Sequence, residues 1–337
     1  MAIIFKLWVD NCRSLHSQHI PPESDLRLLL RADSWDRMLV DNIWAKEGQG
    51  CLAAGKNLAT WDMVGLEPPS TNGSVPPMTA RRAQQARDSQ MQRTIKPRVF
   101  KSRVFYMSPA AFMALRKKCN EELGTTDVSG NDILMALIWC SLIKARTAAL
   151  AVHNIKVDMD GLVEIQVPVD GRPDFSQHMA LPQTYIGNMV VYHMPVVPLR
   201  ALVGPDTTTS IAQTIRTSAR NINHQTMLDG YSLLRQIPDY GLITPMPRAS
   251  QEGTWLISSM LMVPDDTCFS DQLFHNHGRP DGVRPLMSGR NKFEVPVSFI
   301  MPRKKSGGIE FTVSMFEDEL EFFMEDEELG RYAFLLA

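Results

Sequence analysis

Cysteine is scarce in this chain of 337 residues, and the spacing of what is present excludes two common uses of the residue. The five cysteines are odd in number, and no two of them form a Cys-x-x-Cys pair. Neither a disulfide framework nor a zinc site is therefore predicted, and the pattern favours a reduced, cytoplasmic setting. No pair of histidines has metal-ligand spacing with a third ligand, so no metal is expected.

An excess of charge of one sign is also lacking. The chain has 35 Lys and Arg against 37 Asp and Glu, a formal net charge of −2, and its isoelectric point is near 6.5. This balance produces no field that would attract nucleic acid or an anionic membrane, so neither partner is predicted. The one basic run, within residues 67–98, contains no aromatic residue and is typical of a solvated surface.

Several catalytic motifs are absent as well. The chain has no P-loop, no Gly-x-Ser-x-Gly elbow and no dinucleotide fingerprint, so phosphoryl and hydride transfer have no support. The apolar opening residues are interrupted by Lys6 and Asp10, which predicts neither a signal peptide nor a membrane span. With 44% hydrophobic and 21% charged residues, about two globular domains are expected.

What is present is a mixed order of strand and helix patterns, which predicts an α/β fold with a mixed sheet. Strands are expected over 99–107, 163–167, 189–192, 255–260, 294–301 and 309–315. Helices are expected over 1–19, over 207–234 and in the acidic segment near the end. In that last helix the residues expected to pack inward are Leu320, Phe323 and Met324, and those expected to face water are Glu317, Glu319, Glu325 and Glu327.

Two further helices have clear starting signals. Ser108 supplies an N-cap, and Pro109 a favourable first residue, for a helix that continues to about Cys119. Ser129 and Asp132 form a capping-box pattern, and a long apolar stripe at helical spacing follows them. The stripe by itself is fully explained by a buried core helix.

A polar loop joins two predicted strands between residues 164 and 192. It carries Asp170 and Arg172, and a covered arginine needs a partner, so a structural ion pair is one interpretation. Gly187 and Asn188 tolerate positive φ, so a sharp turn is expected there before the next strand.

This loop resembles the BAHD-type acyl-CoA-dependent acyltransferases, most closely their fungal secondary-metabolism branch, which holds trichothecene and fumigaclavine O-acetyltransferases. In that family a strand, an Asp-x-Arg loop, a Leu-Pro and an aromatic-x-Gly-Asn precede the next strand. The matching residues here are Asp170, Arg172, Leu181, Pro182, Tyr185, Gly187 and Asn188.

Three other segments carry the same resemblance. The helix that begins near Ser129, Asn131 and Asp132 resembles the family's Ser/Thr-x-Asn-Asp-Ala-Leu helix, and Ser258 with Ser259 matches the strand of its Ser-Trp motif. Downstream of that strand, the residues that fit the family's glycine-rich motif are Gly278, Arg279, Pro280 and Arg284.

The front half of the downstream motif departs from the family. An Asp-Phe-Gly is expected there, and its aspartate would pair with the arginine that matches Arg172. The chain has Phe274-His-Asn276 instead, so Asp271 is the nearest candidate partner if the loop is shifted.

His277 and Asp281 reproduce the spacing of the family's catalytic His-x-x-x-Asp, but their context is wrong. The catalytic segment should run into a helix, whereas Pro280, Gly282 and Pro285 oppose a helix here. With eight histidines in the chain, one such match by chance is unremarkable, and we interpret these two residues as a decoy.

The resemblance implies a chloramphenicol-acetyltransferase-like architecture of two α/β domains. The helix predicted over 1–19 is similar to the one that follows the catalytic histidine in the fungal enzymes, so that histidine is expected before Met1 and the N-terminal domain is expected to be largely missing. The predicted domains are 1–66, the tail of that first domain, 67–98, a crossover linker, and 99–337, the C-terminal domain.

The function that the resemblance implies is acyl-CoA-dependent O-acyl transfer, with acetyl as the expected acyl group, to a small hydroxylated secondary metabolite. Acyl-CoA would be a co-substrate, with no permanently bound cofactor, and the protein would be a monomer. The residues expected near the CoA channel are Ser129, Asn131, Asp132, Ser258 and Ser259. The alternative is a non-catalytic remnant of such an enzyme.

Overall fold

The computed structural model describes residues 34–48, 50, 58–66, 99–125, 127–177, 181–182, 185–237, 254–261, 263, 284 and 296–336. The predicted helix over 1–19, the predicted crossover over 67–98, and the motif residues Asp271 and His277 to Asp281 lie outside these described residues.

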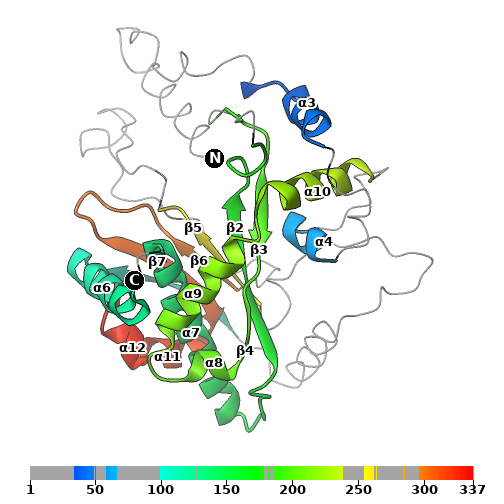
Figure 1. Ribbon diagram of the computed structural model, residues 1–337. Coiled ribbons are helices and arrows are strands. Elements are labelled where there is room, and N and C mark those ends of the chain that lie inside the picture. Colours follow the sequence, from blue (N-terminus) through cyan, green and yellow to red (C-terminus); the bar gives the residue numbers. More distant parts are fainter. Residues whose placement is uncertain are drawn as a thin grey trace.

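One mixed sheet of eight strands forms the centre of the fold (Figure 1). Its strands are β1 (Phe100–Met107), β2 (Leu162–Asp170), β3 (Val190–His193), β4 (Val196–Pro198), β5 (Trp255–Ser259), β6 (Val297–Ile300), β7 (Ile309–Phe316) and β8 (Ala333–Leu335). The order is β3-β2-β5-β6-β7-β1-β8, and β4 also pairs with β2. Strands β2, β5 and β6 are parallel, and the other pairings are antiparallel. The predicted mixed α/β sheet is confirmed.

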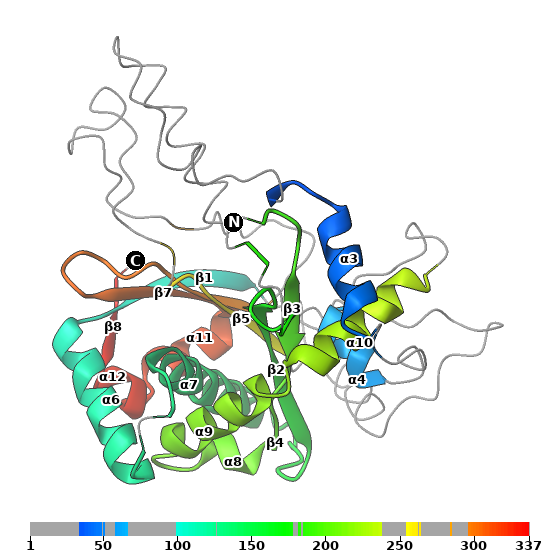
Figure 2. The ribbon, with the colours of Figure 1, turned by 45° about the horizontal axis from the view of Figure 1, so that its top comes forward.

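Helices cover one face of this sheet, as Figure 2 shows. They are α6 (Pro109–Leu123), α7 (Gly130–Val152), α8 (Arg200–Val203), α9 (Thr208–Ala219), α11 (Glu317–Met324) and α12 (Glu327–Gly330). Helix α7 is the central one, because α8, α9, α11 and α12 all pack against it. The result is two layers, a sheet and a helical layer, with the main apolar core between them.

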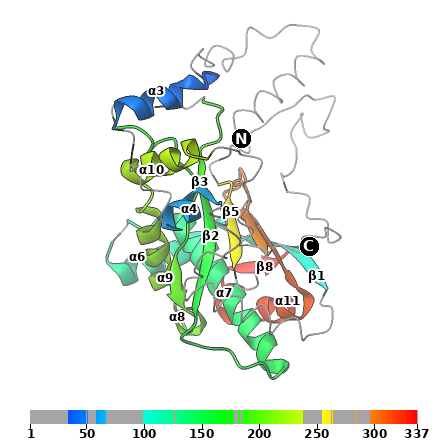
Figure 3. The same cartoon turned by 90° about the vertical axis from the view of Figure 1, so that its right-hand side faces the viewer.

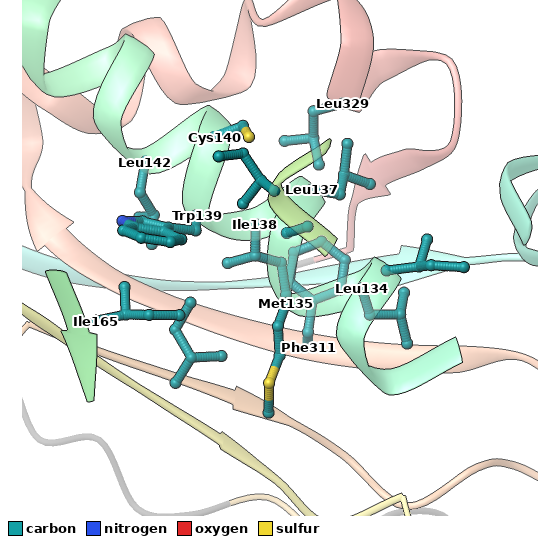
Figure 4. Packing of buried hydrophobic residues seen from close by; sticks show 14 of the residues in the cluster. Leu134, Met135, Leu137, Ile138, Trp139, Cys140, Leu142, Ile165, Phe311 and Leu329 are labelled. Atoms are coloured by element: carbon teal, nitrogen blue, oxygen red, sulfur yellow. The ribbon is translucent and has the colours of Figure 1, made fainter. Parts of the chain in front are cut away.

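Helix α7 is buried on every side over most of its length. All of its residues from Asp132 to Ile143 are buried, and Figure 4 shows their side chains meeting Ile165 of β2, Phe311 of β7 and Leu329 of α12. Among the described residues it is the one helix long and apolar enough to cross a membrane, but 78% of its most apolar window is inside the protein. This burial is that of a core helix.

The predicted starting signals of these helices are confirmed. Ser108 Oγ accepts a hydrogen bond from the Ala111 N–H at 3.1 Å and starts α6, although the helix continues past Cys119 to Leu123. At α7, Ser129 and Asp132 form the complete capping box, in which each side chain binds the backbone N–H of the other.

A smaller apolar cluster lies beyond the β3 edge of the sheet. Figure 3 shows three helices there, α3 (Met38–Lys46), α4 (Leu58–Val64) and α10 (His224–Arg235). The Trp44 indole N–H donates to Ser232 Oγ at 2.8 Å. Glu47, at the end of α3, lies 3.3 Å from His224 Nε2, and Tyr231 donates to Asp41 at 3.0 Å. Helix α3 and Glu47 are therefore fixed to α10 by specific polar contacts.

The prediction of one continuous helix over 207–234 is wrong. The segment over 207–234 forms two helices, α9 and α10, which are separated near Asn221. Asn223 starts the second helix, because its side chain accepts from the Thr226 N–H while Thr226 accepts from the Asn223 N–H. A local capping box therefore overrides the continuous helical spacing of the apolar residues.

The acidic helix also differs from the prediction in part. In α11, Leu320 and Phe323 are buried as expected, but Glu319 is 1% exposed and Met324 is 42% exposed. The helix ends at Met324, so this last side chain faces solvent while Phe323 stays in the core. Helix α12 and the edge strand β8, which pairs with β1, follow it and were not predicted.

We expect the core around α7 to dominate stability. Leu137→Ala removes a fully buried side chain of α7 and should lower the free energy of unfolding by about 2–5 kcal/mol, because a cavity remains. The matched control is Met113→Ala on α6, where the side chain is 58% exposed and the change should stay within about 0.5 kcal/mol. Urea denaturation of both variants measures the difference, and equal midpoints would contradict this view of the core.

Candidate active site

On β7, the residues that face away from the helices are polar. Alternate residues of β7 point into the helical layer, namely Ile309, Phe311, Val313 and Met315. The intervening residues Glu310, Thr312 and Ser314 point to the opposite face, and all three are buried. Ser314 shares a hydrogen bond of 2.6 Å with Ser102 of β1. A buried polar face of this kind is unusual, because buried polar groups need partners.

Polar residues also occupy this face on two of the parallel strands, β2 and β5. Ile257 of β5 packs into the core, so the next residue, Ser258, points to the polar face. On β2, Glu164 and Gln166 occupy the corresponding positions and are both buried. Ser259 points to the helical side, and its Oγ accepts a hydrogen bond from the Leu261 N–H at 3.3 Å.

Glu310 is the charged centre of this face. Its carboxylate lies 2.9 Å from Arg284 Nε and 2.5 Å from Lys304 Nζ, and the residue is 2% exposed. Burial works to raise the pKa of Glu310, but the hydrogen bonds from these two cations outweigh it and hold the pKa below its ordinary value. Arg284, a predicted motif residue, therefore serves as an ion-pair partner of β7.

The predicted residues at the start of α7 form a second polar group. Asp132 is 5% exposed and lies 2.5 Å from Arg216 of α9, in addition to its capping bonds with Ser129. The Asn131 amide donates weakly to Met135 Sδ at 3.7 Å, and its buried Oδ1 has no partner within the described residues. Asp132, which Ser129 holds in place, therefore links the start of α7 to α9.

The two groups of predicted channel residues lie at the same edge of the domain. Arg303, which follows β6, stacks over the Phe112 ring at 4.8 Å, and Gly130 at the start of α7 packs against that ring. Ser258 and Ser259 end β5, which runs parallel to β6, so they lie at this edge too. Within the described part of the chain, no hydrogen bond joins the two groups.

The Asp-x-Arg loop is held together by its own residues. Arg172 Nε lies 2.8 Å from Asp170 Oδ1, and its Nη2 lies 2.8 Å from Asp170 Oδ2, in a forked arrangement. Its Nη1 donates to the Tyr185 carbonyl at 2.9 Å. A carboxylate partner for Arg172 is thus present two residues before it, a possibility that the sequence analysis overlooked, whereas Asp271 lies outside the described residues.

The structure requires a glycine at position 187 for a reason that differs from the predicted turn with positive φ. Gly187 and Asn188 are not among the described residues with positive φ. A Cβ at Gly187 would instead collide with the Tyr185 ring, so close packing requires the glycine. Asn188 Oδ1 accepts a hydrogen bond from the Val190 N–H at 3.2 Å and sets the start of β3.

A buried histidine on β3 was missed by the sequence analysis, which assigned no partner to the histidines outside the decoy. His193 is 5% exposed, and its Nδ1 lies 3.2 Å from Ser218 Oγ of α9. Burial lowers the pKa of His193 to about 4, although the nearby Asp132 carboxylate opposes this shift, so the ring is neutral. Its position in the alternation of β3, shared with the buried Val191, is the signal that could have identified it.

The described cysteines are not activated nucleophiles. Burial raises the pKa of Cys140 to about 12 and also raises the pKa of Cys119. Both thiols instead meet threonine hydroxyls of the α9 region, Thr207 and Thr209.

The mixed sheet with a helical layer on one face, together with the Asp-x-Arg loop, matches a BAHD-type acyltransferase fold. Solved structures agree with this description. F. sporotrichioides TRI101 complexed with coenzyme A and T-2 has a TM-score of 0.57 at 21% identity, over 80% of this chain and 56% of that one. F. graminearum TRI101 complexed with coenzyme A and deoxynivalenol has a TM-score of 0.58 at 19% identity, over 80% and 57%.

Sequence comparison then places the chain in a family. The model of the Transferase family matches residues 53–330, so the chain belongs to this family, in agreement with the BAHD-type motifs. The isocyanide synthase-NRPS hybrid crmA of Aspergillus fumigatus is 27% identical over 98% of this chain and 22% of its own length. The enoyl-CoA isomerase/hydratase claC of Penicillium crustosum is 24% identical over 68% of this chain and 25% of its own length. The chain thus spans about a quarter or less of each curated relative.

Glu310 should make stability depend on pH in the acid range. Because its pKa is lowered in the folded state, its contribution is present above the ordinary value of 4.5 and is lost as the pH falls through the folded-state pKa. Glu310→Gln should therefore cost about 1–3 kcal/mol at pH 7, and this cost should shrink below pH 4.5. Denaturation at several pH values tests this, with the exposed Glu321→Gln as a control that should show no such difference.

Arg172 should contribute more to the free energy of unfolding than an ordinary surface arginine does. Arg172→Ala breaks a forked pair and a bond to the Tyr185 carbonyl, and we expect a loss of about 1–3 kcal/mol. Arg200→Ala is the matched control, because Arg200 pairs with Asp160 where both side chains are more than half exposed, and its loss should be below about 1 kcal/mol. Equal losses in thermal or urea unfolding would contradict a special role for the loop.

Proposed function

We propose that this chain is part of an acyl-CoA-dependent O-acyltransferase that transfers an acetyl group to a small hydroxylated secondary metabolite. The observation that carries the proposal is membership of the Transferase family over residues 53–330. The fold supports it, because the similar TRI101 structures are complexes with coenzyme A and a small molecule. Acyl-CoA is then a co-substrate that leaves as CoA, and no permanently bound cofactor is needed.

The chemistry of the described residues favours direct transfer over a covalent acyl-enzyme. Cys119 and Cys140 are buried, and their raised pKa values keep both as thiols. In direct transfer, a general base takes the proton of the acceptor hydroxyl while its oxygen attacks the thioester carbonyl. The tetrahedral intermediate collapses, the carbon–sulfur bond breaks, and CoA leaves as the thiolate or thiol.

The general base of the proposal is a histidine of a His-x-x-x-Asp segment upstream of Met1. Among the described histidines, His153 pairs with Asp318 and His224 pairs with Glu47, so both are engaged in surface or structural contacts. His193 is neutral, but its pKa of about 4 makes it a weak base. The decoy pair His277 and Asp281 has no catalytic part in this proposal.

The test begins with the coding DNA upstream of Met1. An in-frame His-x-x-x-Asp there allows the extended protein to be expressed, and incubation with acetyl-CoA and hydroxylated acceptors should release CoA. Replacing that upstream histidine by alanine should lower turnover by about 10²–10⁴-fold, the usual contribution of a general base.

The chain of 337 residues and one variant provide the controls. The chain alone should release no CoA above background, and His277→Ala in the extended protein should change turnover by no more than a few fold. If the chain alone turned over substrate and His277→Ala abolished that activity, His277 would be the general base. The assignment of the base to a segment upstream of Met1 would then be refuted. Stop codons in place of the upstream segment would favour a non-catalytic remnant.

A further inference from the structure

Three segments that are distant in sequence meet at one ion pair, which joins Glu47 to His224. Glu47 ends α3, His224 begins α10, and the third segment is the loop 171–177, which contains Arg172 of the Asp-x-Arg motif. His224 Nε2 lies 3.3 Å from Glu47 Oε2, and the two side chains are 18% and 5% exposed. Figures 2 and 3 show α3 and α10 side by side. Because both side chains are largely covered, salt screens this pair less than it screens a surface pair.

Glu47 holds the end of the loop through both of its carboxylate oxygens. Its Oε1 accepts a hydrogen bond from Ser176 Oγ, and its Oε2 accepts one from the Gln177 N–H at 3.0 Å. An ionised carboxylate can only accept hydrogen bonds, so two donors favour the ionised form of Glu47. The loop is therefore attached to a negative charge that also faces His224.

Both ring nitrogens of His224 face hydrogen-bond acceptors. Nε2 faces the Glu47 carboxylate, and Nδ1 lies 3.1 Å from the carbonyl oxygen of Phe175 in the loop. A neutral imidazole has one N–H, so it can donate to one of these acceptors while the lone pair of its other nitrogen points at the second. A ring with two protons donates to both. The geometry therefore favours the positively charged form of His224.

Packing holds the front of the loop independently of this charge. The Phe175 side chain is 1% exposed and lies edge-on to the Tyr231 ring, with the centroids 5.5 Å apart. A Cβ at Gly171 would collide with a methionine side chain of α10. The backbone from Phe175 onward is instead attached through His224 and Glu47. A change in the charge of His224 should thus loosen the end of the loop and leave its start in place.

Other charged groups on these elements do not pair with His224. They are Asp41 and Lys46 of α3, Asp170, Arg172 and Asp174 in or beside the loop, Arg220 at the end of α9, and Asp229 and Arg235 of α10. Within the part of the chain that the structure describes, no ion pair or hydrogen bond joins any of them to His224. Glu47 is then the charged group whose contact depends directly on the protonation of His224.

We propose that Glu47 and His224 form a pH-sensitive clamp on the loop 171–177, which is closed while the His224 ring carries two protons and is released when the ring loses one. Histidine ordinarily exchanges this proton near about pH 6.5, so such a clamp responds within the physiological range. Protonation and docking of the loop are linked, so each favours the other. The proposal goes beyond acyl transfer, and none of its tests needs turnover.

Hydrogen exchange of the 337-residue chain tests the release of the loop. Mass spectrometry follows the peptide that contains Ser176 and Gln177, and each rate is divided by the intrinsic exchange rate at that pH to give a protection factor. Protection should fall at least about tenfold between pH 5.5 and pH 8.5, because a hydrogen bond between charged groups is lost. A peptide from the centre of α7 should keep its protection. Equal protection of the loop at the two pH values overturns the proposal.

Variants identify the group that drives the change. His224→Gln removes the titrating ring, so protection of the loop should be low at both pH values, and Glu47→Gln should also remove most of the pH dependence. The matched control is His153→Gln, because His153 lies 3.1 Å from Asp318 in an exposed pair and should leave the loop unaffected. A pH-dependent change that persists in folded His224→Gln overturns the proposal, since another group would then cause it.

Nitrogen NMR of labelled histidine provides a test that needs no variant to fold. The ring of His224, assigned through its contact with Phe175, should show two protonated nitrogens at pH 5.5. It should lose one proton over the same pH range in which the loop loses protection. A ring with a single proton at pH 5.5 in the protected loop overturns the proposal, as does loss of the proton over a range in which protection is constant.

Discussion

The burial of α7 over most of its length is the constraint on which the rest of the structure depends. A helix that is apolar on all sides must be covered on all sides, and here the mixed sheet covers one side while α8, α9, α11 and α12 cover the others. The start of this helix is fixed by the Ser129–Asp132 capping box, and Asp132 also holds Arg216 of α9. Packing and capping therefore fix the helical layer as a unit, and that layer sets the position of the sheet edge where the candidate site residues lie.

Polar groups with defined partners shape two regions of the molecule, the sheet face opposite the helices and the region beyond the β3 edge. On the sheet face opposite the helices, the buried Glu310 is paired with Arg284 and Lys304, so its charge is compensated. Beyond the β3 edge, contacts between α3 and α10 hold the described part of residues 34–66 against the sheet. That arrangement brings α4 to β3, and residues of both elements line a pocket of about 240 Å³ together with His193.

Local signals explain which predictions succeeded. Ser108 and the Ser129–Asp132 pair start their helices as expected, because a cap is a contact between residues close in sequence. The continuous helix expected over 207–234 is wrong for the same kind of reason, since the local cap at Asn223 was overlooked. The burial of Glu319 could not be predicted from local signals, because it depends on how α11 packs against neighbours far away in sequence. The need for Gly187 likewise arises from the Tyr185 ring folding over it, not from its own φ.

The sequence by itself determined the α/β class, the mixed sheet, the core helix and, through short motifs, the BAHD-type resemblance that the Transferase family match bears out. Each of these depends on periodicity or on residues close in the chain, which can be read without the fold. Only the tertiary structure decided that Arg284 pairs with Glu310 and that His193 meets Ser218 beside α4. These groups come from segments far apart in sequence, and the physical reason is that packing, not local propensity, brings them within hydrogen-bonding distance.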